Sequence, residues 1–223
     1  MTTIEVKQRT HLLIIWLVIP LFYLTQISFA QDSSEQLAEA IRDNKKEDVI
    51  RLLKNGTNVN ELTKIGISPL VQAVLGENIE IVKLLVENGA DVNLNTPRFG
   101  SSLIAAAAVG NKEITSYLIE KKADLNSRDR EGKTALMTEI YAGHPEVAKL
   151  LIDLGADVRV KAAPDWTALM FATMRGDFES VKNLIDAKAD VNSKTTDGET
   201  PLQRTVELEY NEIIIILKKA GAK

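Results

Sequence analysis

Leucine recurs in this chain at an interval of 33 residues, without slippage. The first leucine column consists of Leu37, Leu70, Leu103, Leu136, Leu169 and Leu202. The second consists of Leu52, Leu85, Leu118, Leu151, Leu184 and Leu217. A glutamate column in the same register consists of Glu47, Glu80, Glu113, Glu146, Glu179 and Glu212. A fixed period of this length predicts an array of stacked repeats instead of a single globular core.

Within one period, the apolar and polar positions predict two short helices and a polar loop. Thr134 is suited to cap a helix over residues 135–142, which are mostly apolar or small. The segment 143–146, Gly-His-Pro-Glu, ends that helix and begins another, because proline and glutamate both favour a first helical turn. Apolar residues then fall at helical spacing up to Leu154, and Gly155 ends the second helix in a left-handed conformation.

This unit resembles the ankyrin repeat, whose signature is Thr-Pro-Leu-His-x-Ala followed later by Gly-Ala-Asp. The signature stands here as Ser68-Pro69-Leu70-Val71-Gln72-Ala73 and Thr200-Pro201-Leu202-Gln203-Arg204-Thr205, and Gly-Ala-Asp as residues 89–91 and 155–157. The resemblance implies an all-α solenoid of about six helix-turn-helix repeats with projecting hairpin loops. The expected repeat domain is 35–223, with repeats 35–67, 68–100, 101–133, 134–166, 167–199 and 200–223.

Three departures from the family pattern carry structural expectations. The signature histidine is absent from every repeat, so the ties between neighbouring turns should be more apolar. Glu139 stands in a column of alanines, where a buried carboxylate would be costly. Either the fourth repeat is splayed there, or Glu139 has a hydrogen-bond donor nearby. Lys122 and Lys188 replace the helix-ending glycine, at about 1 kcal/mol each if the left-handed conformation persists.

The first thirty residues have the pattern of a secretory signal peptide. Lys7 and Arg9 precede an apolar run, 12–24, and Ser28-Phe29-Ala30 resembles a cleavage site. Residues 31–34 form a short polar lead-in. The alternative is an uncleaved anchor over residues 12–29, which could just cross a bilayer. Both place the repeats outside the cytoplasm, because the positive charges precede the apolar run. The expected location is the periplasm or the medium, or alternatively the periplasmic face of the inner membrane.

Composition argues against several other classes of function. Residues 31–223 carry 25 basic and 30 acidic side chains, a net charge of −5, which disfavours nucleic-acid binding. The chain has no cysteine, and after residue 30 its one histidine is His144, at a position the family uses structurally. We therefore expect no enzymatic activity, cofactor, metal or small-molecule substrate.

The function class that remains is protein binding, because a solenoid presents an extended concave face that is suited to binding another protein. Family positions on the hairpins and first helices predict a groove rich in aromatic and arginine side chains, the types that dominate binding hot spots. The candidate protein-binding residues are Arg98, Phe99, Arg130, Tyr141, Trp166, Phe171, Met174 and Arg175. The prediction is a monomeric interaction module with an unidentified protein partner. The alternatives are a secreted effector that binds a host protein, and a membrane-anchored envelope scaffold.

Overall fold

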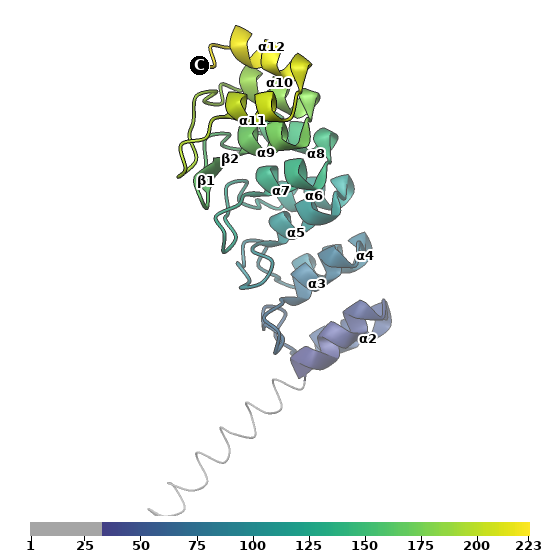
Figure 1. Ribbon diagram of the computed structural model, residues 1–223. Coiled ribbons are helices and arrows are strands. Elements are labelled where there is room, and N and C mark those ends of the chain that lie inside the picture. Colours follow the sequence, from purple (N-terminus) through teal and green to yellow (C-terminus); the bar gives the residue numbers. More distant parts are fainter. Residues whose placement is uncertain (1–32) are drawn as a thin grey trace, which may run out of the picture.

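The computed structural model describes residues 33–223, where helices follow one another in pairs (Figure 1). The expected signal peptide or anchor, residues 1–30, lies outside the described residues. Helical residues 33–42 pair with α2 (Lys46–Lys54). The following pairs are α3 (Pro69–Leu75) with α4 (Ile79–Glu87), α5 (Ser102–Val109) with α6 (Lys112–Glu120), α7 (Ala135–Ala142) with α8 (Pro145–Asp153), α9 (Ala168–Arg175) with α10 (Phe178–Asp186), and α11 (Pro201–Glu207) with α12 (Asn211–Lys219).

The predicted caps begin the first helix of each pair from α3 onward. In one column of serine and threonine, each side chain accepts a hydrogen bond from the backbone N–H three residues later, which satisfies a donor that the helix leaves unpaired. The column is Ser68, Ser101, Thr134, Thr167 and Thr200. The left-handed turns after the second helices are also confirmed, since Lys122 and Lys188 have φ values of 68° and 65°.

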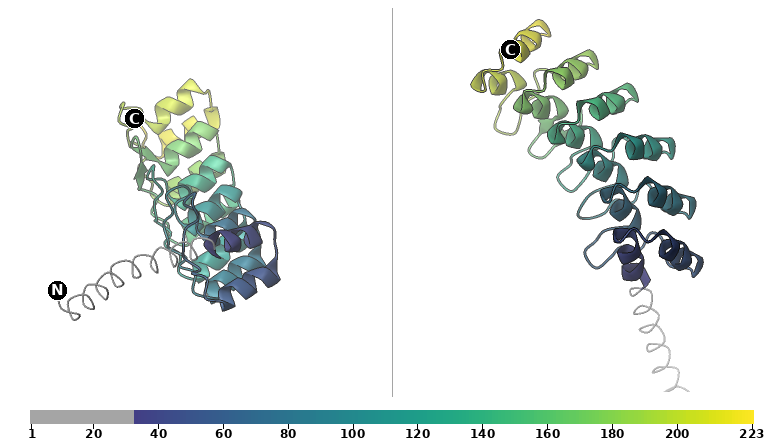
Figure 2. Two further views of the ribbon diagram at one scale, coloured as in Figure 1. Left: turned by 90° about the horizontal axis from the view of Figure 1, so that it is seen from below. Right: turned by 90° about the vertical axis from the view of Figure 1, so that its right-hand side faces the viewer.

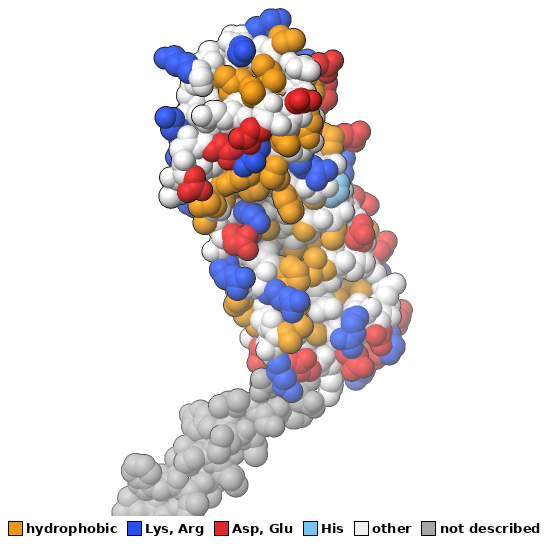
Figure 3. Space-filling model, in the orientation of Figure 1, with side chains coloured by type: hydrophobic (Ala, Val, Ile, Leu, Met, Phe, Trp, Pro, Cys, Tyr) orange, Lys and Arg blue, Asp and Glu red, His pale blue; other side chains and the backbone are white. Residues whose placement is uncertain are grey.

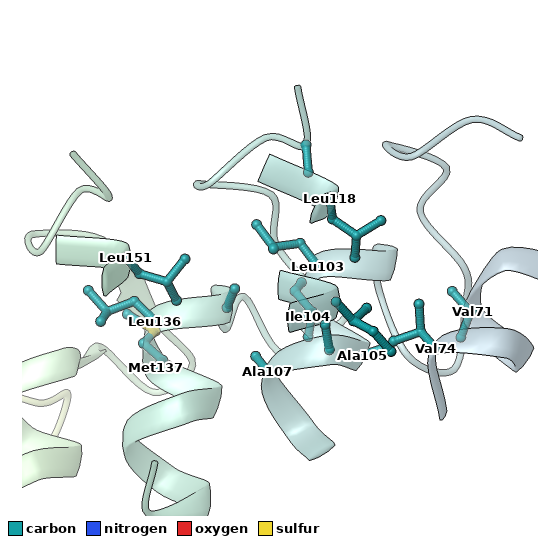
Figure 4. Packing of buried hydrophobic residues seen from close by; sticks show 14 of the residues in the cluster. Val71, Val74, Leu103, Ile104, Ala105, Ala107, Leu118, Leu136, Met137 and Leu151 are labelled. Carbon is teal, nitrogen blue, oxygen red and sulfur yellow. The ribbon is translucent and has the colours of Figure 1, made fainter. Parts of the chain in front are cut away.

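The two leucine columns form the core (Figure 4). Leu103 and Leu118 are fully buried, and Leu136 is 1% exposed. Each leucine is covered by the neighbouring helix pair, which is how a solenoid buries apolar surface that one repeat could not bury alone. In the α11–α12 pair, Leu202 of the same column is only partly buried.

Short hairpins connect the helix pairs, as the family resemblance implies. The most regular one pairs β1 (Lys161–Ala162) with β2 (Trp166–Thr167) in antiparallel register, and Thr96 forms a bridge with Gly100. The position of the missing histidine is apolar and buried at Val71, as expected. The expectation that the ties between neighbouring turns would be more apolar is nevertheless wrong at the position of Asn93. Asn93 donates to the carbonyl of Lys122 and accepts from the N–H of Asp124, so polar hydrogen bonds join these two turns.

The array begins earlier than expected. The sequence predicts a polar lead-in at Ser33 and Ser34, but both are helical, and Ser34 is fully buried. Residues 33 and 34 are thus helical before residue 36, which corresponds to Pro69, the first residue of α3. Within residues 33–223, no helix is long and apolar enough to span a bilayer.

The stacked pairs fan out, so that the second helices lie on the outer side and the hairpins project from the opposite side (Figure 2). The first helices and the hairpins therefore line one continuous face. This face is the concave groove in which the binding residues were expected.

Candidate protein-binding groove

Three aromatic rings from two consecutive repeats meet in the groove. Tyr141 on α7 packs edge-on against Phe171 on α9, with ring centroids 6.0 Å apart and an interplanar angle of 78°. Trp166 on β2 packs against the same Phe171, with centroids 5.0 Å apart. Both distances are those of favourable aromatic pairs. We call Tyr141, Trp166 and Phe171 the aromatic patch, and Figure 3 shows apolar side chains gathered over this part of the molecule.

The three rings differ in how much they offer to a partner. Tyr141 is 53% exposed, whereas Trp166 is partly buried. Phe171 is only 6% exposed, so it offers little surface for direct contact with a partner. Its neighbours Tyr141 and Trp166 cover it, and it acts as the support on which they pack. Met174 is partly buried against the same core and is less exposed than Tyr141.

Two ion pairs flank the aromatic patch. The Lys133 ammonium lies 5.6 Å from the Tyr141 ring centroid and 2.7 Å from a Glu131 carboxylate oxygen. On the other side, the Arg204 guanidinium lies 5.9 Å from the Trp166 ring centroid and 2.6 Å from a Glu199 carboxylate oxygen. Neither Lys133 nor Glu199 is among the binding residues predicted from the sequence. The signal was present, because both lie 33 residues from Trp166 and thus occupy its column.

The predicted arginines and Phe99 are distributed along the groove. Arg175 is exposed and donates from Nη1 to the carbonyl of Tyr141 at 2.8 Å, so it adjoins the aromatic patch. Arg98 lies 5.4 Å from the ring of Phe99 on an earlier hairpin, two repeats before Trp166. Arg130 is exposed on the hairpin between them. The structure thus brings together Tyr141, Trp166, Phe171 and Arg175, while Arg98, Phe99 and Arg130 lie on preceding repeats.

Glu139 lies next to the groove residues in sequence but is buried. The alternatives for Glu139 were a splayed fourth repeat or a nearby hydrogen-bond partner. The structure shows the second, because Glu139 Oε2 lies 3.0 Å from His144 Nδ1. Burial raises the pKa of Glu139 to about 8. With one partly exposed histidine as its neighbour, this carboxyl group is a structural feature of the fourth repeat. Within residues 33–223, no group of three or more acidic or histidine side chains is arranged to hold a metal ion.

Stacked helix pairs with projecting hairpins define a solenoid repeat protein. A family model described as "Ankyrin repeats (3 copies)" matches residues 36–129, 72–162 and 160–223. Together these matches extend from residue 36 to residue 223, and the chain belongs to the ankyrin-repeat family. A search of curated proteins gave no match. Ankyrin repeats generally serve as protein–protein interaction modules and are typically non-catalytic.

Proposed function

We propose that this chain binds a protein partner through its concave groove, and that Tyr141 is the central contact. The observation that carries the proposal is an aromatic side chain left 53% exposed while its neighbours hold it in place. An exposed ring that packs against Phe171 and has the Lys133 ammonium 5.6 Å from its centroid loses little conformational freedom on binding, which is the property of a hot-spot residue. The proposed module is a monomer that uses no cofactor, catalyses no reaction, and contains six repeats, the first formed by helical residues 33–42 and α2.

The test is crosslinking capture with tagged full-length protein, from envelope and culture-medium fractions of cells that produce it. Tyr141→Ala removes the exposed ring. Ile215→Ala is the matched control, because Ile215 is also 53% exposed but lies on α12, the second helix of its pair. We expect a protein that is captured by the unaltered chain and by the Ile215 variant, and lost with the Tyr141 variant. Equal capture by both variants would place binding on another face.

The proposed site of action is outside the cytoplasm, in the periplasm or in the medium after removal of residues 1–30. Support comes from the basic start, the apolar run and the small-x-small end of that segment. The intact mass of the mature protein tests this proposal, since cleavage near Ala30 removes a defined mass. An intact N-terminus in the membrane fraction would favour an anchored scaffold. Recovery in the medium, with a host protein as partner, would favour a secreted effector.

A further inference from the structure

We propose that the groove recognises an extended acidic segment carrying one large apolar side chain. This inference rests on the proposed function and specifies the chemistry of the partner. The apolar side chain would pack on Tyr141 of the aromatic patch. The acidic residues would lie along the three preceding hairpins, toward the N-terminal end of the array. The inference depends on which charges in the groove are already neutralised within the protein and which are not.

Two acidic side chains beside the aromatic patch are already paired. Glu131 is bound by Lys133, and Glu199 is bound by Arg204, which also lies 3.6 Å from Glu207. These pairs lie beside the aromatic rings and present cations to them. The patch therefore has an apolar centre with neutralised edges, and it can accept an apolar side chain without leaving a carboxylate unpaired.

The cations on the preceding hairpins are not paired in this way. Lys64, Arg98 and Arg130 are exposed on three successive hairpins, and among residues 33–223 none of their side chains forms an ion pair. Glu35 accepts a hydrogen bond from the backbone N–H of Lys64 and not from its ammonium group. We call Lys64, Arg98 and Arg130 the cationic track. Side chains on successive hairpins are displaced by one repeat each, so an extended chain crossing the hairpin tips meets them in turn. A partner with acidic residues at matching intervals would gain ion pairs and faster association.

The last two hairpins carry charges of both signs, exposed Asp165 and Asp197 together with exposed Lys161 and Lys194. A partner whose acidic residues lie along the cationic track avoids Asp165 and Asp197, which favours this direction over the opposite one.

Fluorescently labelled synthetic peptides test this inference with purified full-length protein in mild detergent. The first peptide is rich in aspartate and glutamate and contains one tryptophan. The second replaces the acids with lysine, and the third replaces the tryptophan with serine. Each is titrated against the unaltered protein, the Arg98→Glu/Arg130→Glu variant, Tyr141→Ala, and a control, Lys112→Glu/Lys182→Glu. The control changes the net charge equally on exposed positions of α6 and α10.

We expect the first peptide to bind best, with an affinity that falls as salt is added. Its affinity should drop about tenfold or more with the arginine variant and with Tyr141→Ala, and remain unchanged with the control. Equal binding of the lysine peptide, or no effect of the arginine variant, overturns the acidic segment. If no peptide binds while capture of a cellular protein still requires Tyr141, the inference fails and the proposed function stands. If capture is also independent of Tyr141, both fail.

Discussion

Glu139 and His144 form a pair inside the fourth repeat, with the carboxyl Oε2 of Glu139 3.0 Å from the ring Nδ1 of His144. Glu139 is fully buried in a column that is alanine at Ala73, Ala106 and Ala172. Its second oxygen, Oε1, has no hydrogen-bond partner among the described residues. The His144 ring also lies against Gly110 of the preceding repeat, where a Cβ on that glycine would be 2.5 Å from the ring. His144 therefore contacts both the buried carboxyl group of Glu139, whose burial is energetically unfavourable, and the preceding repeat at Gly110.

The first prediction is that Glu139 makes stability depend on pH. Burial raises the pKa of Glu139 from its ordinary value of 4.5 to about 8 in the folded protein. Between these values the unfolded chain has released this proton while the folded chain still holds it. The free energy of unfolding therefore falls as pH rises from 4.5 to 8, and the loss persists above 8.

Glu139→Ala restores the alanine of the column and should remove this loss. Relative to the unaltered protein, the variant should gain on the order of 1–3 kcal/mol in the free energy of unfolding between pH 5 and pH 8. Urea denaturation at a series of pH values measures this difference. Glu179→Ala, at an exposed glutamate of α10, is the control and should leave the pH profile unchanged. Parallel profiles for the Glu139 variant and the unaltered protein would refute the prediction.

The second prediction concerns the leucine core. Leu136→Ala should lower the free energy of unfolding by about 2–5 kcal/mol, because Leu136 is 1% exposed between neighbouring helix pairs. Leu202→Ala changes the same column at the open end of the array, where the leucine is only partly buried, and should cost less. Denaturant melts of both variants give the comparison. Equal losses would mean that the column is no more critical in the middle of the array than at its end.

The third prediction concerns the left-handed turn at Lys122. This lysine has a φ of 68°, a conformation that costs a residue with a Cβ about 1 kcal/mol. Lys122→Gly should therefore raise the free energy of unfolding by up to about 1 kcal/mol. In urea denaturation this appears as a higher midpoint with an unchanged m value. Lys182→Gly, inside α10, should instead destabilise by about 1 kcal/mol, because glycine is unfavourable within a helix. Destabilisation by both glycines would show that the backbone conformation at Lys122 is not strained.

Features that depend on the repeat register could be predicted from the sequence, whereas features that depend on one side chain's neighbours could not. The register alone predicts the leucine core and the cap at Thr134. It also places Phe171 in the groove, but whether a groove position is exposed depends on the size of adjacent side chains, here Tyr141 and Trp166. The contact between Glu139 and His144 likewise depends on how two side chains fold back across a turn. A column pattern carries no information about that geometry.

The last prediction concerns the asparagines that tie neighbouring turns. Asn93 donates to the Lys122 carbonyl at 3.2 Å and accepts from the Asp124 N–H at 2.8 Å, and Asn60 makes the same two contacts with Gly89 and Asp91. Asn93→Ala should therefore cost about 0.5–1.5 kcal/mol, the net value of a hydrogen bond or two at an exposed site.

The opposite substitution can be tested at Arg159, which occupies the position where the other turns have asparagine. Arg159 is held instead to Asp157 in its own turn, 3.4 Å away. Arg159→Asn should add the two missing bonds to the following turn and stabilise the protein by a similar amount. Hydrogen exchange should slow at the Asp190 amide, the counterpart of Asp124, because that N–H would gain an acceptor. If Asn93→Ala is neutral and Arg159→Asn leaves this amide unprotected, the stacking of the turns does not depend on these hydrogen bonds.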